Sequence, residues 1–127
     1  MGNNILIIGS GVSGVGAAKL SKHTKHNVRV TSTQKIKEVN KNFFYSLGVD
    51  FEEGQNSLSN LTWSNLIIKS PGVPPSIPLL TEARAQGIPI ISEIEFASRF
   101  TKSNIIAITG TNGKTTTSKL LWHILSK

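Results

Sequence analysis

The chain has 127 residues, of which 38% are hydrophobic and 17% charged, with no cysteine and a formal net charge of +7. This composition is that of a folded globular protein, and it excludes disulfides and thiolate metal sites. No apolar run approaches the roughly 18 residues needed to cross a bilayer. The basic residues are scattered, without a dense Lys/Arg block or interleaved aromatics, which disfavours a nucleic-acid partner. We therefore expect a cytoplasmic protein without membrane insertion.

Short β-branched runs alternate with helical stretches along the chain, as in α/β proteins with a parallel sheet. Residues 5–8, 28–31, 49–51, 66–69 and 88–91 are the predicted strands. Helices are predicted after the first glycine loop, near residues 36–47, over residues 78–86 and from residue 93 onward. Ser92 is a suitable N-cap for the last of these, and Glu95 stands where it would complete a capping box.

Four polar residues, 101–104, interrupt this pattern and predict a domain boundary. We assign residues 1–102 to a first domain and residues 103–127 to the start of a second one. The second part holds a predicted strand at 105–109, a glycine loop and a helix from Lys114 onward. A lone strand and helix cannot bury their apolar faces. We therefore expect the second part to be a truncated domain that is disordered, docks on the first domain, or self-associates with a neighbouring molecule.

The first glycine loop, residues 9–14, reads Gly-Ser-Gly-Val-Ser-Gly directly after a predicted strand and before a helix. This GxGxxG pattern allows a tight turn at Gly9, close approach of phosphates at Gly11, and tight helix–strand packing at Gly14. The free N–H groups and the positive end of the helix dipole attract an anion. The loop therefore predicts a nucleotide or phosphate site.

The residues after the second strand bear on which nucleotide is bound. A dinucleotide site commonly has an acidic residue there to bind the ribose hydroxyls. This chain has Ser32, Thr33 and Gln34 instead, and hydroxyls and an amide suit a neutral base or sugar. Lys35 and Lys37 leave a 2′-phosphate, and with it NADP, as an alternative. NAD is not supported.

The second glycine loop follows the predicted strand 105–109 and contains Gly-Lys-Thr at its end. Gly113 allows the backbone to curl around phosphate oxygens, Lys114 offers a cation to the β and γ phosphates, and Thr115 offers a hydroxyl to Mg²⁺. Gly110 stands only three residues before Gly113, which is shorter than in the common P-loop. Two such loops predict two phosphate-bearing ligands.

Residues 108–116, Ile-Thr-Gly-Thr-Asn-Gly-Lys-Thr-Thr, resemble the shortened ATP loop of Mur ligases and folylpolyglutamate synthases. Ser-Pro-Gly-Val-Pro-Pro at 70–75, Pro-Leu-Leu at 78–80, Ala-Arg-Ala at 83–85 and Gly-Ile-Pro-Ile-Ile-Ser-Glu-Ile-Glu at 87–95 are similar to the D-glutamate-adding branch of the Mur ligases. The resemblance covers the whole chain in order. It implies a Rossmann-like first domain with flanking helices, followed by the first strand, P-loop and helix of an ATP-binding domain.

The resemblance also implies two sets of binding residues. The set for the UDP part of UDP-N-acetylmuramoyl-L-alanine consists of Gly9, Gly11, Val12, Ser13, Gly14, Ser32, Thr33, Gln34, Ser70 and Gly72. The set for ATP consists of Gly110, Thr111, Asn112, Gly113, Lys114, Thr115 and Thr116, with Lys114 and Thr115 catalytic and Thr115 a Mg²⁺ ligand. The family often has Asp-Thr-Arg where this chain has Ser-Thr-Gln at 32–34.

The resemblance finally implies a reaction and its partners. ATP phosphorylates the alanyl carboxylate of the substrate, and the amine of D-glutamate attacks the acyl phosphate. The full-length enzyme is expected to be a monomer, and this piece alone is expected to be inactive because the remaining site residues lie beyond residue 127. Two alternatives stay open, a stand-alone nucleotide- or UDP-sugar-binding module and a fragment of an NADP-binding oxidoreductase.

Overall fold

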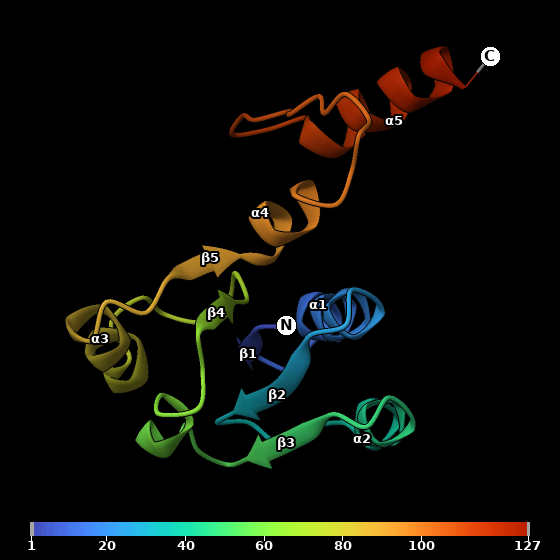
Figure 1. The fold of residues 1–127 in the computed structure, drawn as a ribbon. Coiled ribbons are helices and arrows are strands. Elements are labelled where there is room, and N and C mark those ends of the chain that lie inside the picture. The colour runs from blue at the N-terminus through green and yellow to red at the C-terminus, as the bar shows by residue number, and fades with distance from the viewer. Residues whose placement is uncertain (1, 127) are drawn as a thin grey trace.

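The computed structural model describes residues 2–126 and shows a five-stranded parallel sheet with helices on both faces (Figure 1). The strands are β1 (Asn4–Ile8), β2 (Asn27–Ser32), β3 (Asp50–Glu53), β4 (Leu66–Lys69) and β5 (Ile90–Ser92), in the order β3-β2-β1-β4-β5. The helices are α1 (Val12–His23), α2 (Glu38–Ser46), η1 (Leu58–Asn60), α3 (Pro78–Ala85), α4 (Glu93–Ser98) and α5 (Lys114–Leu125). The predicted α/β fold with a parallel, Rossmann-like sheet is therefore confirmed.

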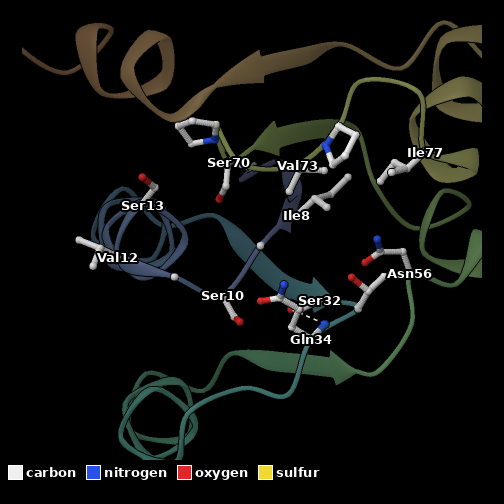
Figure 2. A pocket seen from close by; sticks show the side chains of 16 residues that line it. Ile8, Ser10, Val12, Ser13, Ser32, Gln34, Asn56, Ser70, Val73 and Ile77 are labelled. Atoms are coloured by element: carbon white, nitrogen blue, oxygen red, sulfur yellow. Dashed lines mark hydrogen bonds between the residues drawn. The ribbon is translucent and has the colours of Figure 1, made fainter.

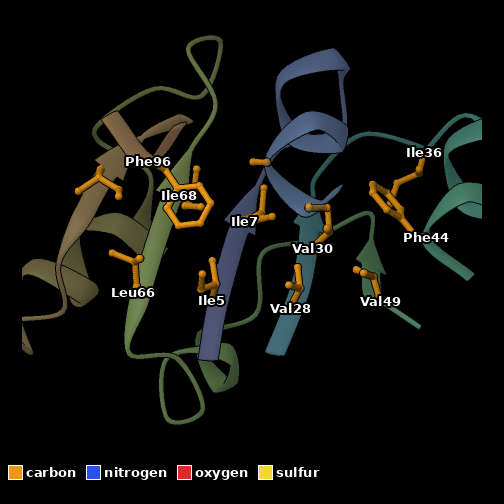
Figure 3. Close-up of a cluster of buried hydrophobic side chains, with 13 residues drawn as sticks. Ile5, Ile7, Val28, Val30, Ile36, Phe44, Val49, Leu66, Ile68 and Phe96 are labelled. Carbon is orange, nitrogen blue, oxygen red and sulfur yellow. The ribbon is translucent and has the colours of Figure 1, made fainter. Parts of the chain in front are cut away.

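The central strand β1 is apolar at four successive positions because it is covered on both faces. Ile5 and Ile7 point into one core cluster, and Leu6 and Ile8 point into the other, as the alternation of side chains along a strand requires. The first cluster includes residues of α1, α2 and α4, among them Phe44 (Figure 3). The second includes Leu79, Leu80 and Ala83 of α3. These two layers fix the carboxyl ends of the strands in space.

The strand predicted at residues 105–109 is not formed, and this prediction was wrong. Ile105 and Ile106 keep 64% and 60% of their surface exposed, and residues 104–110 have no strand neighbour. A strand is stabilised by backbone hydrogen bonds to an adjacent strand, so this apolar segment cannot become one alone. The helix α5 does form, but Trp122 is 71% exposed and none of the helix residues is buried. Figure 1 shows α5 standing away from the sheet.

The start of α4 matches one half of the predicted capping box. Ser92 is the N-cap, and its hydroxyl accepts a hydrogen bond from the Glu95 backbone N–H at 3.0 Å. The Glu95 carboxylate does not complete the box, because it pairs with Arg99 one turn later at 2.9 Å. An i,i+4 ion pair therefore takes the place of the reciprocal cap.

Candidate functional site: a nucleotide cavity at the sheet switch point

The first glycine loop leads from β1 into α1 and presents the open amino-terminal end of that helix. Gly11 is the N-cap, so no side chain of its own occupies the first amides, and the first turn holds no acidic residue. The first intrahelical bond runs from the Val15 N–H to the Gly11 carbonyl at 2.9 Å. The amides before Val15 are therefore directed outward, where the helix dipole also favours an anion.

Two glycines of this loop are required by close contacts. Gly9 has a φ of +107°, and a Cβ there would lie 2.7 Å from the Ser70 hydroxyl oxygen. A Cβ on Gly14 would collide with the carbonyl oxygen of Gly9. The loop is thus pressed against α1 on one side and against the Ser70 loop on the other. The positive φ of Gly9 supports its predicted role in a tight turn, and the close contact at Gly14 supports its predicted role in packing.

A cavity of about 720 Å³ opens above this loop (Figure 2). It lies at the carboxyl ends of β1, β2 and β4. The chain continues from β1 to β2 and β3 on one side of the sheet and to β4 and β5 on the other, so the strand order reverses between β1 and β4. Ligands of open α/β sheets bind at such switch points. The cavity has the volume of a small-molecule site.

The structure brings together nearly all the residues predicted for the UDP substrate. Those that line the cavity are Gly9, Gly11, Val12, Ser13, Ser32, Thr33, Gln34, Ser70 and Gly72. Gly14 does not line it and packs behind the loop. These residues come from three separate stretches of sequence, so their convergence is a result of the fold.

Several lining residues were missed by sequence reasoning: Ile8, Ser10, Asn56, Pro71, Val73, Pro74 and Ile77. Four of them form an apolar wall that extends from Pro71 to Ile77, opposite the polar residues at the end of β2 (Figure 2). Asn56 was the least visible, because it belongs to the loop after β3, for which no motif exists. Only the topology could have indicated that this loop borders the cavity, because loops that follow parallel strands meet at one edge of the sheet.

A partly buried polar network supports the wall at the end of β2. The Glu52 carboxylate accepts hydrogen bonds from the Ser57 backbone N–H at 2.9 Å, from Asn60 Nδ2 at 3.0 Å and from the Thr31 hydroxyl at 2.8 Å, and also from the Ser57 hydroxyl. Burial alone would raise the pKa of Glu52, but the hydrogen bonds from Ser57, Thr31 and Asn60 outweigh it and lower that pKa below its ordinary value. Glu52 is therefore ionised at neutral pH.

A second acidic residue holds the loop that follows β2. The Glu53 carboxylate accepts a hydrogen bond from the Ile36 backbone N–H at 2.7 Å and pairs with Lys41 at 2.9 Å. The hydrogen bond from Lys41 lowers the pKa of Glu53, and the same hydrogen bond raises the pKa of Lys41. Residues 33–35 are thereby held between the end of β2 and the Ile36 N–H that Glu53 binds.

Two further side chains brace the loops that line the cavity. Asn40 of α2 donates from Nδ2 to the Ser10 carbonyl at 2.8 Å, which ties the first glycine loop to α2. Lys69 donates to the carbonyls of Ser70 and Val73 at 3.1 and 2.9 Å, which closes the turn of the apolar wall. Pre-formed loops of this kind reduce the entropy cost of binding a ligand.

The second glycine loop has local order without a surrounding site. Gly113 is the N-cap of α5 with a φ of +76°, and no acidic residue occupies the first turn. Lys114 folds back over the loop and donates to the Gly110 carbonyl at 2.5 Å. The predicted ATP residues from Gly110 to Thr116 are all exposed. An open helix end with a lysine beside it fits a polyphosphate and its Mg²⁺.

Comparisons with known proteins show the family of this chain. The model of the family "Mur ligase MurD-like, N-terminal domain" matches residues 3–92. A UDP-N-acetylmuramoylalanine–D-glutamate ligase of Bacteroides fragilis is 43% identical over 120 residues, covering 94% of this chain and 27% of that protein. The ligase of the same name from Cytophaga hutchinsonii is also 43% identical, covering 100% of this chain and 29% of its own length. This chain therefore spans less than a third of the relatives that it matches.

A solved structure gives the same result for the fold. The murein peptide ligase Mpl of Psychrobacter arcticus superimposes with a TM-score of 0.74 at 25% identity, covering 98% of this chain and 26% of that protein. The chain belongs to the Mur ligase family and carries its MurD-like amino-terminal domain. The family resemblance expected from the motifs is confirmed.

Within residues 2–126, no helix is long and apolar enough to span a bilayer. The same part of the chain contains no group of three or more His, Asp or Glu side chains that could hold a metal ion.

Proposed function

We propose that the cavity binds the UDP part of UDP-N-acetylmuramoyl-L-alanine, and that the chain is the amino-terminal part of a ligase that adds D-glutamate to it. The observation that carries this proposal is the composition of the cavity. A helix end suited to a diphosphate stands beside a wall of hydroxyl and amide groups formed by Ser32, Thr33, Gln34 and Asn56. The ends of β2 and β3 offer no carboxylate among the lining residues to hold the ribose of a dinucleotide.

The proposed arrangement follows from the order of the loops around the cavity. The diphosphate lies on the amides of residues 11–13, the uracil and ribose lie toward Ser32, Thr33 and Gln34, and the sugar lies toward Ser70 and Gly72. Residues 8–77 supply all the lining. We therefore expect the first domain, residues 1–102, to bind the UDP part without help from residues 103–127.

The second loop is proposed to bind ATP and Mg²⁺ in the full-length enzyme. Bound ATP supplies the phosphoryl group that activates the alanyl carboxylate. Lys114 would neutralise charge on the transferred phosphoryl group, Thr115 would ligate Mg²⁺, and the amides of residues 110–116 would hold the phosphates. The exposure of this loop supports the expectation that the present chain alone does not ligate D-glutamate.

Calorimetric titration of this chain tests the proposal. We expect saturable binding of UDP-N-acetylmuramoyl-L-alanine and of UDP, and at least tenfold weaker binding of NADPH. Ser13→Glu places a carboxylate at the helix end and should abolish UDP binding by repulsion. Thr81→Glu, which makes the same charge change on an exposed face of α3 outside the cavity, is the matched control. Binding of NADPH with no response to UDP would instead support the oxidoreductase alternative.

A further inference from the structure

Lys69 is the last residue of β4, and it directly precedes Ser70, which lines the cavity. The other three residues of this strand are apolar and buried, whereas Lys69 is partly buried. Its Cα atom pairs with those of Ile8 in β1 and Ser92 in β5, so the side chain starts from inside the sheet, at the edge where the cavity opens. A lysine in such a place needs defined partners for its ammonium group, because taking a cation out of water is costly unless it is bound.

The partners of this ammonium group are two backbone carbonyls. Lys69 Nζ donates to the carbonyl oxygen of Ser70 at 3.1 Å and to that of Val73 at 2.9 Å. Within residues 2–126, no carboxylate forms an ion pair with it. Lys69 therefore holds together the two ends of one turn, residues 70–73, which we call the Ser70 turn. Hydrogen bonds from a cation are stronger than those between neutral groups.

The Ser70 turn has few other contacts that fix its shape. In the part of the chain that the structure describes, a single backbone hydrogen bond closes it, from the Val73 N–H to the Ser70 carbonyl at 3.1 Å. Pro71 has no N–H to donate. The space beside Gly72 is open, because a Cβ there would meet nothing within 4 Å. The two bonds from Lys69 are therefore a main restraint on this turn.

Two groups of the Ser70 turn remain available to a ligand. Ser70 and Gly72 both line the cavity. Among residues 2–126, neither the Ser70 hydroxyl nor the Gly72 N–H makes a hydrogen bond to another group. Figure 2 shows Ser70 on the wall opposite Ser32 and Gln34. In the proposed binding mode, the sugar that follows the diphosphate reaches the Ser70 turn, whereas the uridine lies toward the opposite wall.

We infer that Lys69 is a positioning residue for the sugar end of the substrate, because it holds the Ser70 turn with the Ser70 hydroxyl and the Gly72 N–H available to the group beyond the diphosphate. The inference rests on the proposed function, since it assumes that the first glycine loop binds the diphosphate of a UDP-sugar. Without the ammonium group the turn gains conformational freedom, and ordering it on binding then lowers the affinity. This cost applies only to a ligand that contacts the turn. The affinity for UDP, which ends at the diphosphate, is therefore expected to stay the same.

Calorimetric titrations of this chain with UDP-N-acetylmuramoyl-L-alanine and with UDP test the inference. We expect the wild-type chain to bind the first ligand about tenfold more tightly, as two additional hydrogen bonds allow. Lys69→Met keeps the length of the side chain and removes its charge. It should reduce this preference to less than about threefold and change the affinity for UDP by less than about twofold. Lys69→Arg keeps a cation with several donors and should retain most of the preference.

Arg84→Met is the matched control. Arg84 also donates to a backbone carbonyl of the same segment, that of Pro75 at 2.8 Å, but Pro75 does not line the cavity. The variant makes the same charge change outside the Ser70 turn and should leave the preference unchanged.

Hydrogen exchange gives a second measurement that is independent of binding. The Val73 amide donates across the Ser70 turn, so in Lys69→Met it should exchange about tenfold faster, while the amides of β1 keep their wild-type rates. An unchanged rate at Val73 would mean that Lys69 does not hold the turn, and the inference would be wrong. Thermal unfolding followed by circular dichroism establishes that each variant is folded.

The binding outcomes separate the inference from the proposed function. If Lys69→Met lowers both affinities by the same factor, or changes neither, the inference is wrong while the UDP site stands. Equal binding of the two ligands by the wild-type chain also overturns it, since the Ser70 turn would then not reach the sugar. If the folded wild-type chain binds neither ligand, the proposed function fails and the inference falls with it. Loss of the preference in Lys69→Met, with Lys69→Arg and Arg84→Met close to wild type, supports both.

Discussion

Both glycine loops of this chain end at the first turn of a twelve-residue helix, α1 in one case and α5 in the other. Each helix has a glycine as its N-cap, Gly11 and Gly113, and neither has an acidic residue in its first turn. The surroundings differ. The first loop is pressed against its own helix and against Ser70, and it borders a cavity, whereas the residues of the second loop are exposed.

The difference separates two requirements for binding a phosphate-bearing ligand. Outward amides and a helix dipole arise from a few consecutive residues and are present at both loops. A selective pocket also needs walls, and the first loop receives them from the ends of β2 and β4. The braces from Asn40 and Lys69 are long-range contacts that only a completed sheet can provide. The second loop lacks such walls in residues 2–126.

The largest expected contrast between the two loops is in hydrogen exchange. Amides of β1 should exchange only through global unfolding, with protection of about 10³-fold or more for a domain of ordinary stability. Amides of α5 should be protected less than about tenfold, because an isolated helix of this length is marginal in water. Exchange measured by NMR on a dilute monomer gives both values. Slow exchange of α5 under those conditions would mean that the helix docks on the first domain.

Substituting Gly14 should produce the next largest effect. Gly14→Ala places a Cβ against the Gly9 carbonyl and should lower the free energy of unfolding by about 2–3 kcal/mol. Gly16→Ala is the matched control two residues later in α1, where a Cβ meets nothing within 4 Å and should stabilise the helix by up to about 1 kcal/mol. Urea unfolding followed by circular dichroism measures both. Equal midpoints for the two variants would show that the first loop is not closely packed.

The network behind the first cavity should give a pH-dependent effect of intermediate size. Glu52→Gln removes a charged acceptor and should cost about 1–2 kcal/mol at pH 7. Because the folded-state pKa of Glu52 lies below its ordinary value of 4.5, its contribution is present above pH 4.5 and disappears as the pH falls through the folded-state pKa. The stability gap between wild type and variant should therefore narrow below pH 4. A gap that stays constant down to pH 3 would contradict this account.

Much of the fold was predictable because strong local patterns agree with the tertiary structure. The strand at 66–69 was predicted with its observed bounds, and Pro78 starts α3 as expected from its fixed φ. The segment 105–109 has an equally strong strand pattern and failed. Its isoleucines specify a buried strand only when a neighbouring strand is present, and that condition lies outside the local sequence.

The cavity was predicted in part for a similar reason. Gly9 and Gly11 were predicted from the glycine motif. Val12, Ser13 and residues 32–34 were predicted from the family resemblance. Asn56 was not, since its position depends on Glu52, Thr31 and Ser57, which lie apart in sequence and form a network only after the strands align. The brace from Asn40 to Ser10 spans 30 residues and leaves no local signal.

The smallest effect is expected for a substitution in the second glycine loop, and it tests directly whether the two loops act independently. Among residues 2–126, Lys114 donates only to the Gly110 and Thr111 carbonyls of its own loop, and it lies outside the lining of the first cavity. Lys114→Met should therefore leave the urea midpoint and the affinity for UDP unchanged within error, whereas Ser13→Glu removes UDP binding. If Lys114→Met weakens UDP binding, the second loop must fold over the first cavity in solution. The two loops would then form one site, and the cavity lined by residues 8–77 would not be sufficient for binding.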